Sequence, residues 1–290
     1  MNIRTIIIII LICIIIGMLL HKKIGYILDR YIWYKTIEIP FQPNVRNLLL
    51  ISNSREYEFG REDYFNHCKS NIKKFLKPFN IRNVLFIPYA GANITPLGVP
   101  LDYDEYMEIV DTDFFADLGI KLIPIHHIEN PHDKRKAILN AECIFIGGGN
   151  AFKLMHELEK NELVDTIKSA VDKGIPYLGV SSGTVIASQS LHTSRSIPIM
   201  NMQSYAGLDL VPFNINVHYY RDLGSRLNQY LLRDPKKKIL AVTEGCIIHI
   251  VGDEGELVGF GDGEIIERDN GTFIREDIMP GDNISFLLKN

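Results

Sequence analysis

A serine between two glycines is the residue of this sequence best suited to nucleophilic chemistry. Residues 177–184 read YLGVSSGT, a short apolar run that passes into a helical stretch through a GxSxG turn. The glycines permit a tight, strained bend that lifts the Ser181 hydroxyl above a sheet. Ser182 then begins the helix, so its backbone N–H faces the space where an oxyanion would form. The segment predicts an attacking serine, although the same motif also occurs as a purely structural turn.

A glycine-rich turn follows another apolar run. Residues 146–150 read IGGGN, and such a loop can present bare backbone N–H groups to an anion. The loop lacks the Lys-Ser/Thr pair of a P-loop and the spacing of a dinucleotide-binding motif, which makes phosphate binding the lesser interpretation. In an open α/β sheet both turns emerge at the carboxyl edge of the strands. The N–H of Gly149 is therefore a candidate second donor to the oxyanion.

A serine nucleophile needs a base, and the sequence offers nine histidines. We select His218 because a segment of alternating apolar residues precedes it and aromatic residues follow it. Most of the other histidines are expected at the surface. Spacing alone leaves the choice of the base open.

The elements that would position these residues alternate along the chain. Continuous apolar runs of strand length are interleaved with amphipathic stretches of helical length, which is typical of a parallel sheet covered on both faces. We therefore predict an α/β, Rossmann-like architecture. The strands are expected at Leu48–Ser52, Val84–Pro88, Lys121–Ile125, Cys143–Ile146 and Pro176–Gly179, and the helices at Asp63–Leu76, Asp104–Leu118, His132–Leu139, Ala151–Glu159 and Glu162–Lys173.

After Leu240 the pattern changes to short apolar runs separated by turns rich in glycine and aspartate. This pattern predicts antiparallel hairpins at the C-terminal edge of the sheet. Their strands are expected at Ile247–Val251, Leu257–Phe260, Ile265–Glu267 and Thr272–Ile274.

The composition excludes several classes of protein. Of the 290 residues 46% are hydrophobic and 23% charged, which is ordinary for a globular chain. The net charge is -4 and no basic stripe is present, so nucleic acid is not an expected partner. The four cysteines have no CxxC or Cys/His spacing, and we predict no disulfide scaffold, no metal site and no cofactor. No linker divides residues 46–290, which are expected to form one domain.

The first 45 residues have a different character. Residues 6–20 form an unbroken apolar run that His21-Lys22-Lys23 closes. The run is shorter than the roughly 20 residues that span a bilayer, but lysine stems can extend its reach. We predict an N-terminal hydrophobic helix that anchors the protein in a membrane, followed by an aromatic connector up to residue 45. Secretion after cleavage of a signal peptide is the alternative, and the side of the membrane is left open.

Six short motifs occur in a fixed order along the chain. They are LISNS at 50–54, VLFIPYAG at 84–91, DEY at 104–106, GGGN at 147–150, GVSSG at 179–183 and NVH at 216–218. In this order they resemble the peptidase E family of α-aspartyl dipeptidases, serine peptidases with a class I glutamine amidotransferase-like fold. The resemblance covers about residues 47–258 and implies hydrolysis of small peptides that begin with aspartate.

The same resemblance implies roles for individual residues. It assigns the nucleophile to Ser181 and the base to His218, and the oxyanion donors to the N–H groups of Gly149 and Ser182. The acid of the family falls on Ser196, whose hydroxyl can bond an imidazole but cannot stabilise an imidazolium as a carboxylate does.

Three alternatives stay open for the third member of the site. In the first, Glu244 replaces the acid, since it follows an apolar run and matches a Glu-Gly of the family. In the second, a dyad of Ser181 and His218 works alone. In the third, the protein is a catalytically impaired homologue that binds a peptide or a partner protein. For the substrate, the resemblance points to Arg226 as the partner of an acidic side chain. Asn150 of the GGGN motif is a further candidate for substrate binding.

Overall fold

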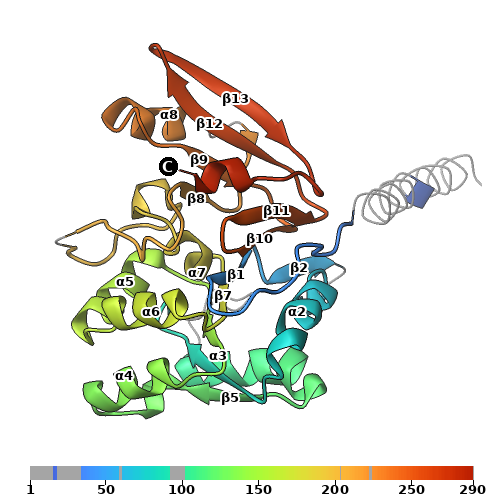
Figure 1. Ribbon diagram of the computed structural model, residues 1–290, viewed down its shortest axis with the longest axis vertical. Coiled ribbons are helices and arrows are strands. Elements are labelled where there is room, and N and C mark those ends of the chain that lie inside the picture. The colour runs from blue at the N-terminus through green and yellow to red at the C-terminus, as the bar shows by residue number, and fades with distance from the viewer. Residues whose placement is uncertain are drawn as a thin grey trace, which may run out of the picture.

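The computed structural model describes residues 16–17, 34–58, 61–91, 102–202, 204–221 and 224–289. Within these ranges the chain forms a large sheet, a smaller sheet and a separate hairpin, with helices around them (Figure 1). The strands are β1 Asn47–Ile51, β2 Arg55–Glu58, β3 Arg61–Tyr64, β4 Asn83–Ile87, β5 Lys121–Pro124, β6 Ile144–Ile146, β7 Tyr177–Val180, β8 Asn214–Asn216, β9 Ile239–Val242, β10 Cys246–Val251, β11 Glu254–Gly259, β12 Gly263–Asp269 and β13 Thr272–Ile278. The α-helices are α2 Lys69–Leu76, α3 Tyr103–Val110, α4 Pro131–Leu139, α5 Ala151–Lys160, α6 Val164–Asp172, α7 Ser182–Val185 and α8 Gly224–Arg233.

The large sheet has the strand order β11-β10-β1-β7-β6-β4-β5, and its strands from β1 to β5 run parallel. Successive side chains of β1 point to opposite faces: Leu48 and Leu50 pack with α5 and α6, and Leu49 and Ile51 pack with α2 and α3. Both faces are covered, and for this reason the strands are apolar throughout. The predicted mixed α/β fold with a mostly parallel sheet is confirmed, and each predicted parallel strand lies within one residue of the observed one.

The predicted helices are also present, with one clear difference at the first of them. The chain was expected to be helical from Asp63, but β3 continues to Tyr64 and α2 begins only at Lys69. Between them Phe65 has a positive φ of 60° and donates its N–H to the carbonyl of Ser54. This turn buries the Phe65 ring completely, and that tertiary gain outweighs the helical pattern of the segment.

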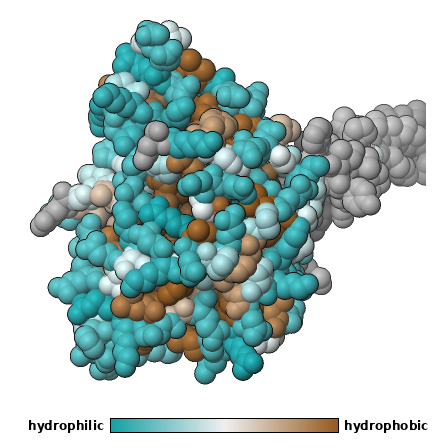
Figure 2. Space-filling model, in the orientation of Figure 1, coloured by the Kyte–Doolittle hydropathy of each residue, from teal (hydrophilic) through white to brown (hydrophobic). Residues whose placement is uncertain are grey.

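The predicted C-terminal hairpins form, but they divide between two sheets. The hairpin of β10 and β11 extends the large sheet next to β1, whereas β12 and β13 belong to the smaller sheet of order β13-β12-β9-β8. The expectation of hairpins at one edge is therefore wrong for the second hairpin. A small apolar cluster that includes Leu227, Leu231 and Ile239 holds α8 against the smaller sheet. The face drawn in Figure 2 is mainly hydrophilic, with smaller apolar areas among the polar ones.

The predicted N-terminal hydrophobic helix lies outside the described residues except for residues 16–17. None of the helices in the described ranges is long and apolar enough to cross a membrane. The connector is described from Tyr34, and it packs on the domain: Lys35 pairs with Gly259, and a carboxylate oxygen of Glu256 accepts the N–H groups of Glu38 and Ile39. The domain boundary at residue 45 stays a prediction.

Candidate active site

Ser181 lies in the turn between β7 and α7, at the carboxyl edge of the large sheet. Its backbone has φ 49° and ψ −105°, a conformation that costs a residue other than glycine about 1–3 kcal/mol. The glycines of the motif are required by close packing, because a Cβ at Gly183 would collide with the carbonyl of Ile146, and a Cβ at Gly179 would lie 2.8 Å from the carbonyl oxygen of Gly183. The turn thus holds a serine in a strained conformation, as the GxSxG motif predicts.

His218 and Glu244 lie in loops that follow strands of the smaller sheet, and these loops reach Ser181 at the edge of the large sheet. His218 follows β8 and Glu244 follows β9, the parallel neighbour of β8. The imidazole Nε2 lies 2.9 Å from the Ser181 Oγ, and Nδ1 lies 3.1 Å from Glu244 Oε1. When Nδ1 carries the proton, the ring donates to Glu244 and can accept the serine proton at Nε2. Hydroxyl, imidazole and carboxylate are therefore in contact in the order that nucleophilic catalysis needs.

Two residues at the end of β1 fix this arrangement through the backbone. The Ser52 hydroxyl accepts the N–H of His218 at 3.1 Å, and the Asn53 side chain accepts the N–H of Gly245, next to Glu244, at 2.7 Å. Both are buried. The LISNS motif thus joins the large sheet to the two loops of the smaller sheet. Sequence reasoning noted the motif but gave these two residues no role.

Glu244 is ionised at neutral pH. The hydrogen bond from His218 is the largest influence on this carboxyl group, and it lowers the pKa of Glu244 below its ordinary value despite partial burial. A charged carboxylate at Nδ1 stabilises the imidazolium that forms when the ring takes a proton.

The glycine loop after β6 contacts the Ser181 turn directly. The Ser182 hydroxyl donates to the carbonyl of Gly149 at 2.5 Å, and a Cβ at Gly148 would lie 3.1 Å from the Ser181 Cβ. The N–H of Gly148 donates to the hydroxyl of Tyr106, whereas Gly149 and Ser182 both line the cavity around Ser181. As the first residue of α7, Ser182 has an N–H that the helix itself does not use. These two N–H groups are suited to hold an oxyanion.

The cavity brings together five of the predicted residues and Ser196. Its lining consists of Gly149, Ser181, Ser182, Val185, Ser194, Arg195, Ser196, Val217, His218, Tyr220 and Glu244. The Ser196 hydroxyl accepts the N–H of Ala151 at 3.1 Å, at the start of α5. The two ring nitrogens of His218 lie at hydrogen-bonding distance from Ser181 and Glu244, whereas the Ser196 hydroxyl bonds the start of α5.

Arg226 and Asn150 are not among the residues that line this cavity. The Arg226 guanidinium is exposed and donates to the carbonyl of Ser194 at 2.6 Å. The Asn150 side chain caps α5 by accepting the N–H groups of Phe152 and Lys153, and its amide donates to the carbonyl of Ile197 at 2.8 Å. Both side chains therefore support the loop 194–197, and their predicted contact with a substrate stays a prediction.

Arg195 is a cation of the cavity that sequence reasoning missed. Its guanidinium donates to the carbonyl of His218 and stacks 5.1 Å from the centre of the exposed Tyr220 ring. The signal for it was present in the sequence, because Arg195 is adjacent to Ser196, the position already matched to the acid of the family.

One group of side chains in the described ranges has the types and spacing to bind a metal ion. It consists of Asp104, His126 and His127, and none of them lines the cavity around Ser181. The sequence predicted no metal site, and Asp104 is separated from His126 by 22 residues of the chain.

Comparison with known proteins decides the family. The model of peptidase family S51 matches residues 48–258. The chain belongs to this family. It is accordingly a serine peptidase of the dipeptidase type, and the resemblance drawn from the six motifs is confirmed.

The relatives cover most of the chain. It is 32% identical over 256 residues to a probable alpha-aspartyl dipeptidase of Drosophila melanogaster, covering 85% of this chain and 99% of that protein. It is also 32% identical over 253 residues to a peptidase E of Nostoc sp., covering 84% of this chain and 97% of that protein. A solved peptidase from an acI-B1 actinobacterium superposes with a TM-score of 0.61 at 17% identity, covering 83% of this chain and 97% of the other, and shows the likeness of the fold.

Proposed function

We propose that this peptidase hydrolyses small peptides with an N-terminal aspartate through the serine, histidine and glutamate of its cavity. The observation that carries the proposal is the continuous contact from the Ser181 hydroxyl through His218 to the Glu244 carboxylate, at 2.9 and 3.1 Å. A serine hydroxyl is a weak nucleophile until a positioned base takes its proton.

In the proposed reaction Ser181 Oγ attacks the peptide carbonyl carbon while His218 Nε2 takes its proton. Glu244 stabilises the imidazolium, and the N–H groups of Gly149 and Ser182 bind the oxyanion. The C–N bond then breaks, and His218 returns the proton to the departing amine. Water attacks the resulting ester with the same base, which releases the amino acid and restores the hydroxyl. The steps balance without a cofactor.

The preference for aspartate rests on charge in the cavity. One relative is named as a probable alpha-aspartyl dipeptidase, and a guanidinium, that of Arg195, lines the cavity here. Arginine binds carboxylates through paired N–H groups. We propose Arg195 as the partner of the substrate carboxylate, while Arg226 acts on the same contact by holding the carbonyl of Ser194 next to it.

The alternative is a catalytically impaired homologue that binds an acidic peptide. The serine at position 196, where the family has its acid, favours it. The contact between Glu244 and His218 argues against it, since that contact supplies the carboxylate from another loop.

Turnover of Asp-X dipeptides tests the proposal. We expect the parent protein to cleave them, and the Ser181→Ala variant to lose at least about 10⁴-fold in turnover with its stability nearly unchanged. Ser204→Ala, at an exposed loop serine outside the cavity lining, is the matched control and should keep full activity. Equal cleavage of Asn-X peptides would contradict the preference for a carboxylate, and full activity in Ser181→Ala would contradict the mechanism. A folded parent protein that only binds Asp-X peptides would establish the alternative.

Attachment to a membrane is a separate proposal that rests on the sequence of residues 6–20 alone. Full-length protein should sediment with membranes and resist extraction by high salt, whereas a chain that starts at Tyr34 should not sediment. Full-length protein of uncleaved mass in the supernatant would contradict the anchor.

A further inference from the structure

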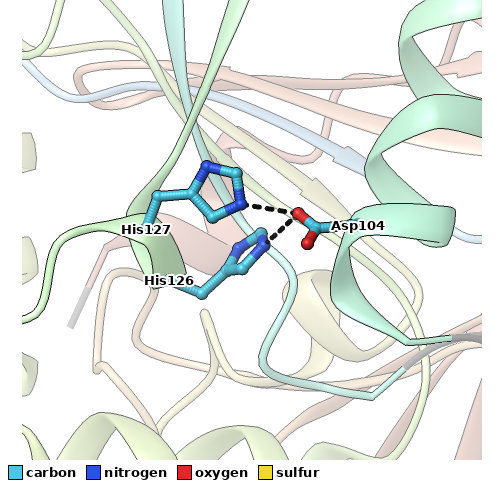
Figure 3. A group of neighbouring side chains, drawn as sticks. All are labelled: Asp104, His126 and His127. Atoms are coloured by element: carbon cyan, nitrogen blue, oxygen red, sulfur yellow. Dashed lines mark hydrogen bonds and ion pairs between the residues drawn. The ribbon is translucent and has the colours of Figure 1, made fainter.

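Two histidines and an aspartate converge on one point at the carboxyl end of β5. Asp104 is in the first turn of α3, and His126 and His127 form a single helical turn with Ile125 directly after β5. Both imidazoles direct Nε2 at the same carboxylate oxygen, Asp104 Oδ1, at distances of 2.9 and 2.6 Å (Figure 3). Each residue offers one ligand atom, and the three atoms lie within 4.8 Å of one another.

We propose that Asp104, His126 and His127 form a binding site for a zinc ion. Zinc takes imidazole nitrogens and carboxylate oxygens at about 2.0–2.2 Å in a tetrahedron, which separates neighbouring ligand atoms by about 3.3–3.5 Å. The observed separations between nitrogen and oxygen are slightly shorter than this. Rotations of the three side chains that move each ligand atom by less than about 1 Å would therefore admit the ion.

The backbone on both sides of the site is held in place independently of an ion. Asp102 caps α3 in a reciprocal arrangement in which its side chain accepts the N–H of Glu105 and the Glu105 side chain accepts the N–H of Asp102. On the other side the His126 ring packs 5.4 Å from the Tyr103 ring. Preorganised ligands lose less freedom on binding, which favours a stable metal site.

Charge and access are also suited to a cation. The first turn of α3 and its cap carry three acidic residues, Asp102, Asp104 and Glu105. The His126 side chain is 12% exposed, whereas those of His127 and Asp104 are 54% and 63% exposed. The site is therefore closed on one side and open to solvent on the other. A three-residue ligand set leaves the fourth position for water.

The ligand types indicate the class of metal. Two imidazoles and one carboxylate suit zinc, whereas magnesium and calcium prefer a shell of oxygens. The ion would fasten the end of β5 to the start of α3. Ser181 and its partners are not among the ligands, so hydrolysis by the proposed mechanism does not depend on it.

Binding of zinc to the full chain tests the proposal. Protein stripped of metal with a chelator is titrated with zinc chloride in competition with a chromophoric chelator. Cobalt(II) is added separately to record the visible absorption that reports tetrahedral nitrogen and oxygen ligands. The variants are His127→Ala and Asp104→Asn, both at exposed side chains. The matched control is His132→Ala, since His132 is exposed on α4 and also lies beside an aspartate, Asp133, at 3.5 Å.

We expect one zinc ion per chain in the parent protein and in His132→Ala. Affinity should fall at least tenfold in His127→Ala and in Asp104→Asn, with loss of the cobalt absorption. Zinc should raise the thermal midpoint of the parent but not of His127→Ala. Affinity unchanged in both cluster variants would place the ion elsewhere, for example at His218 and Glu244, and would overturn the proposal. A zinc affinity that is no higher in the parent protein than in His127→Ala would also overturn the proposal. Turnover of Asp-X peptides by these variants is measured in parallel. Because zinc binding and turnover are separate readouts, failure of the zinc proposal can be distinguished from failure of the proposed mechanism.

Discussion

Among the described residues, two histidine–glutamate pairs lie in different surroundings. His249 on β10 lies with Nδ1 2.8 Å from Oε1 of Glu256 on β11, and the two side chains are only 3% and 10% exposed. His218 and Glu244 make the same contact at 3.1 Å, but are 29% and 51% exposed at a cavity. The chemical groups are the same in both pairs. Their neighbours differ, and the neighbours decide what each pair can do.

The hydrogen bonds of the buried pair, His249 and Glu256, hold parts of the structure together. Although burial raises the pKa of Glu256, the bonds from His249 and from the N–H groups of Ile39 and Glu38 outweigh it and hold that pKa below its ordinary value. This pair thus fastens the N-terminal connector to the large sheet. The other pair has Ser181 at the second ring nitrogen instead, as the proposed proton transfer requires. A histidine–carboxylate contact predicts catalysis only where a nucleophile and a cavity accompany it.

Replacement of each histidine by alanine should give the largest difference between the two pairs in turnover and in stability. His218→Ala takes away the base, so turnover should fall on the order of 10⁶-fold with stability nearly unchanged. His249→Ala leaves a buried carboxylate without its partner and should lower the free energy of unfolding by about 3–5 kcal/mol, with turnover per folded molecule retained. Urea denaturation and Asp-X turnover measure the two effects. A folded His249→Ala variant without activity would contradict the comparison.

Replacement of each glutamate by glutamine should show the same difference between the two pairs, with a smaller effect on turnover. Glu244→Gln keeps the shape of the side chain but loses the charge that stabilises the imidazolium, and turnover should fall on the order of 10⁴-fold. Glu256→Gln, its matched control, should change turnover by less than about threefold. A negligible effect of Glu244→Gln would remove Glu244 from the catalytic group and leave a dyad of Ser181 and His218.

The pH dependence of stability sharpens the assignment of Glu256. Its pKa is lower in the folded protein than in the unfolded chain, where it is about 4.3. The pair therefore stabilises the fold fully above about pH 4.3, and this stabilisation is lost as the pH falls through the lower folded pKa. Glu256→Gln should be less stable than the parent at pH 7, and its urea midpoint should decline less between pH 5 and pH 3. Parallel declines in the two proteins would show that Glu256 does not contribute.

The smallest effect is expected at Ser196. Ser196→Asp restores the acid of the family, but Glu244 already occupies Nδ1 of His218, and the new carboxylate would lie beside the first N–H groups of α5. Turnover of Asp-X peptides should therefore change by less than about threefold. A rise of tenfold or more would mean that Glu244 does not orient the imidazole in solution.

The parts of this fold that follow from local pattern could be predicted from the sequence. The parallel strands are continuous apolar runs because both faces are buried, and the Ser181 turn carries the glycines that its close packing requires. The smaller sheet as a unit could not be predicted in the same way. The alternation around β8 indicates a strand, but it does not show that this strand pairs with β9 in a second sheet.

The contacts of the site depend on tertiary structure, and this limited the prediction of individual roles. The function of Ser52 and Asn53 arises from bonds to loops 166 and 192 residues further along the chain, which no local spacing reveals. Glu244 was one of three alternatives, and its contact with His218 depends on the pairing of β8 with β9, which the sequence does not reveal. The group of Asp104, His126 and His127 was missed for the same reason, since its three residues come from two separate elements.

Labelling with a fluorophosphonate probe tests the central claim most directly, because the probe reacts with a serine only when a base activates it. Full-length protein is treated with the probe, digested and analysed by tandem mass spectrometry, with His218→Ala and His249→Ala treated in parallel. We predict one adduct, on Ser181, in the parent and in folded His249→Ala, and none in His218→Ala. A folded parent protein that carries no adduct on Ser181, or that is labelled equally well without His218, would contradict the account.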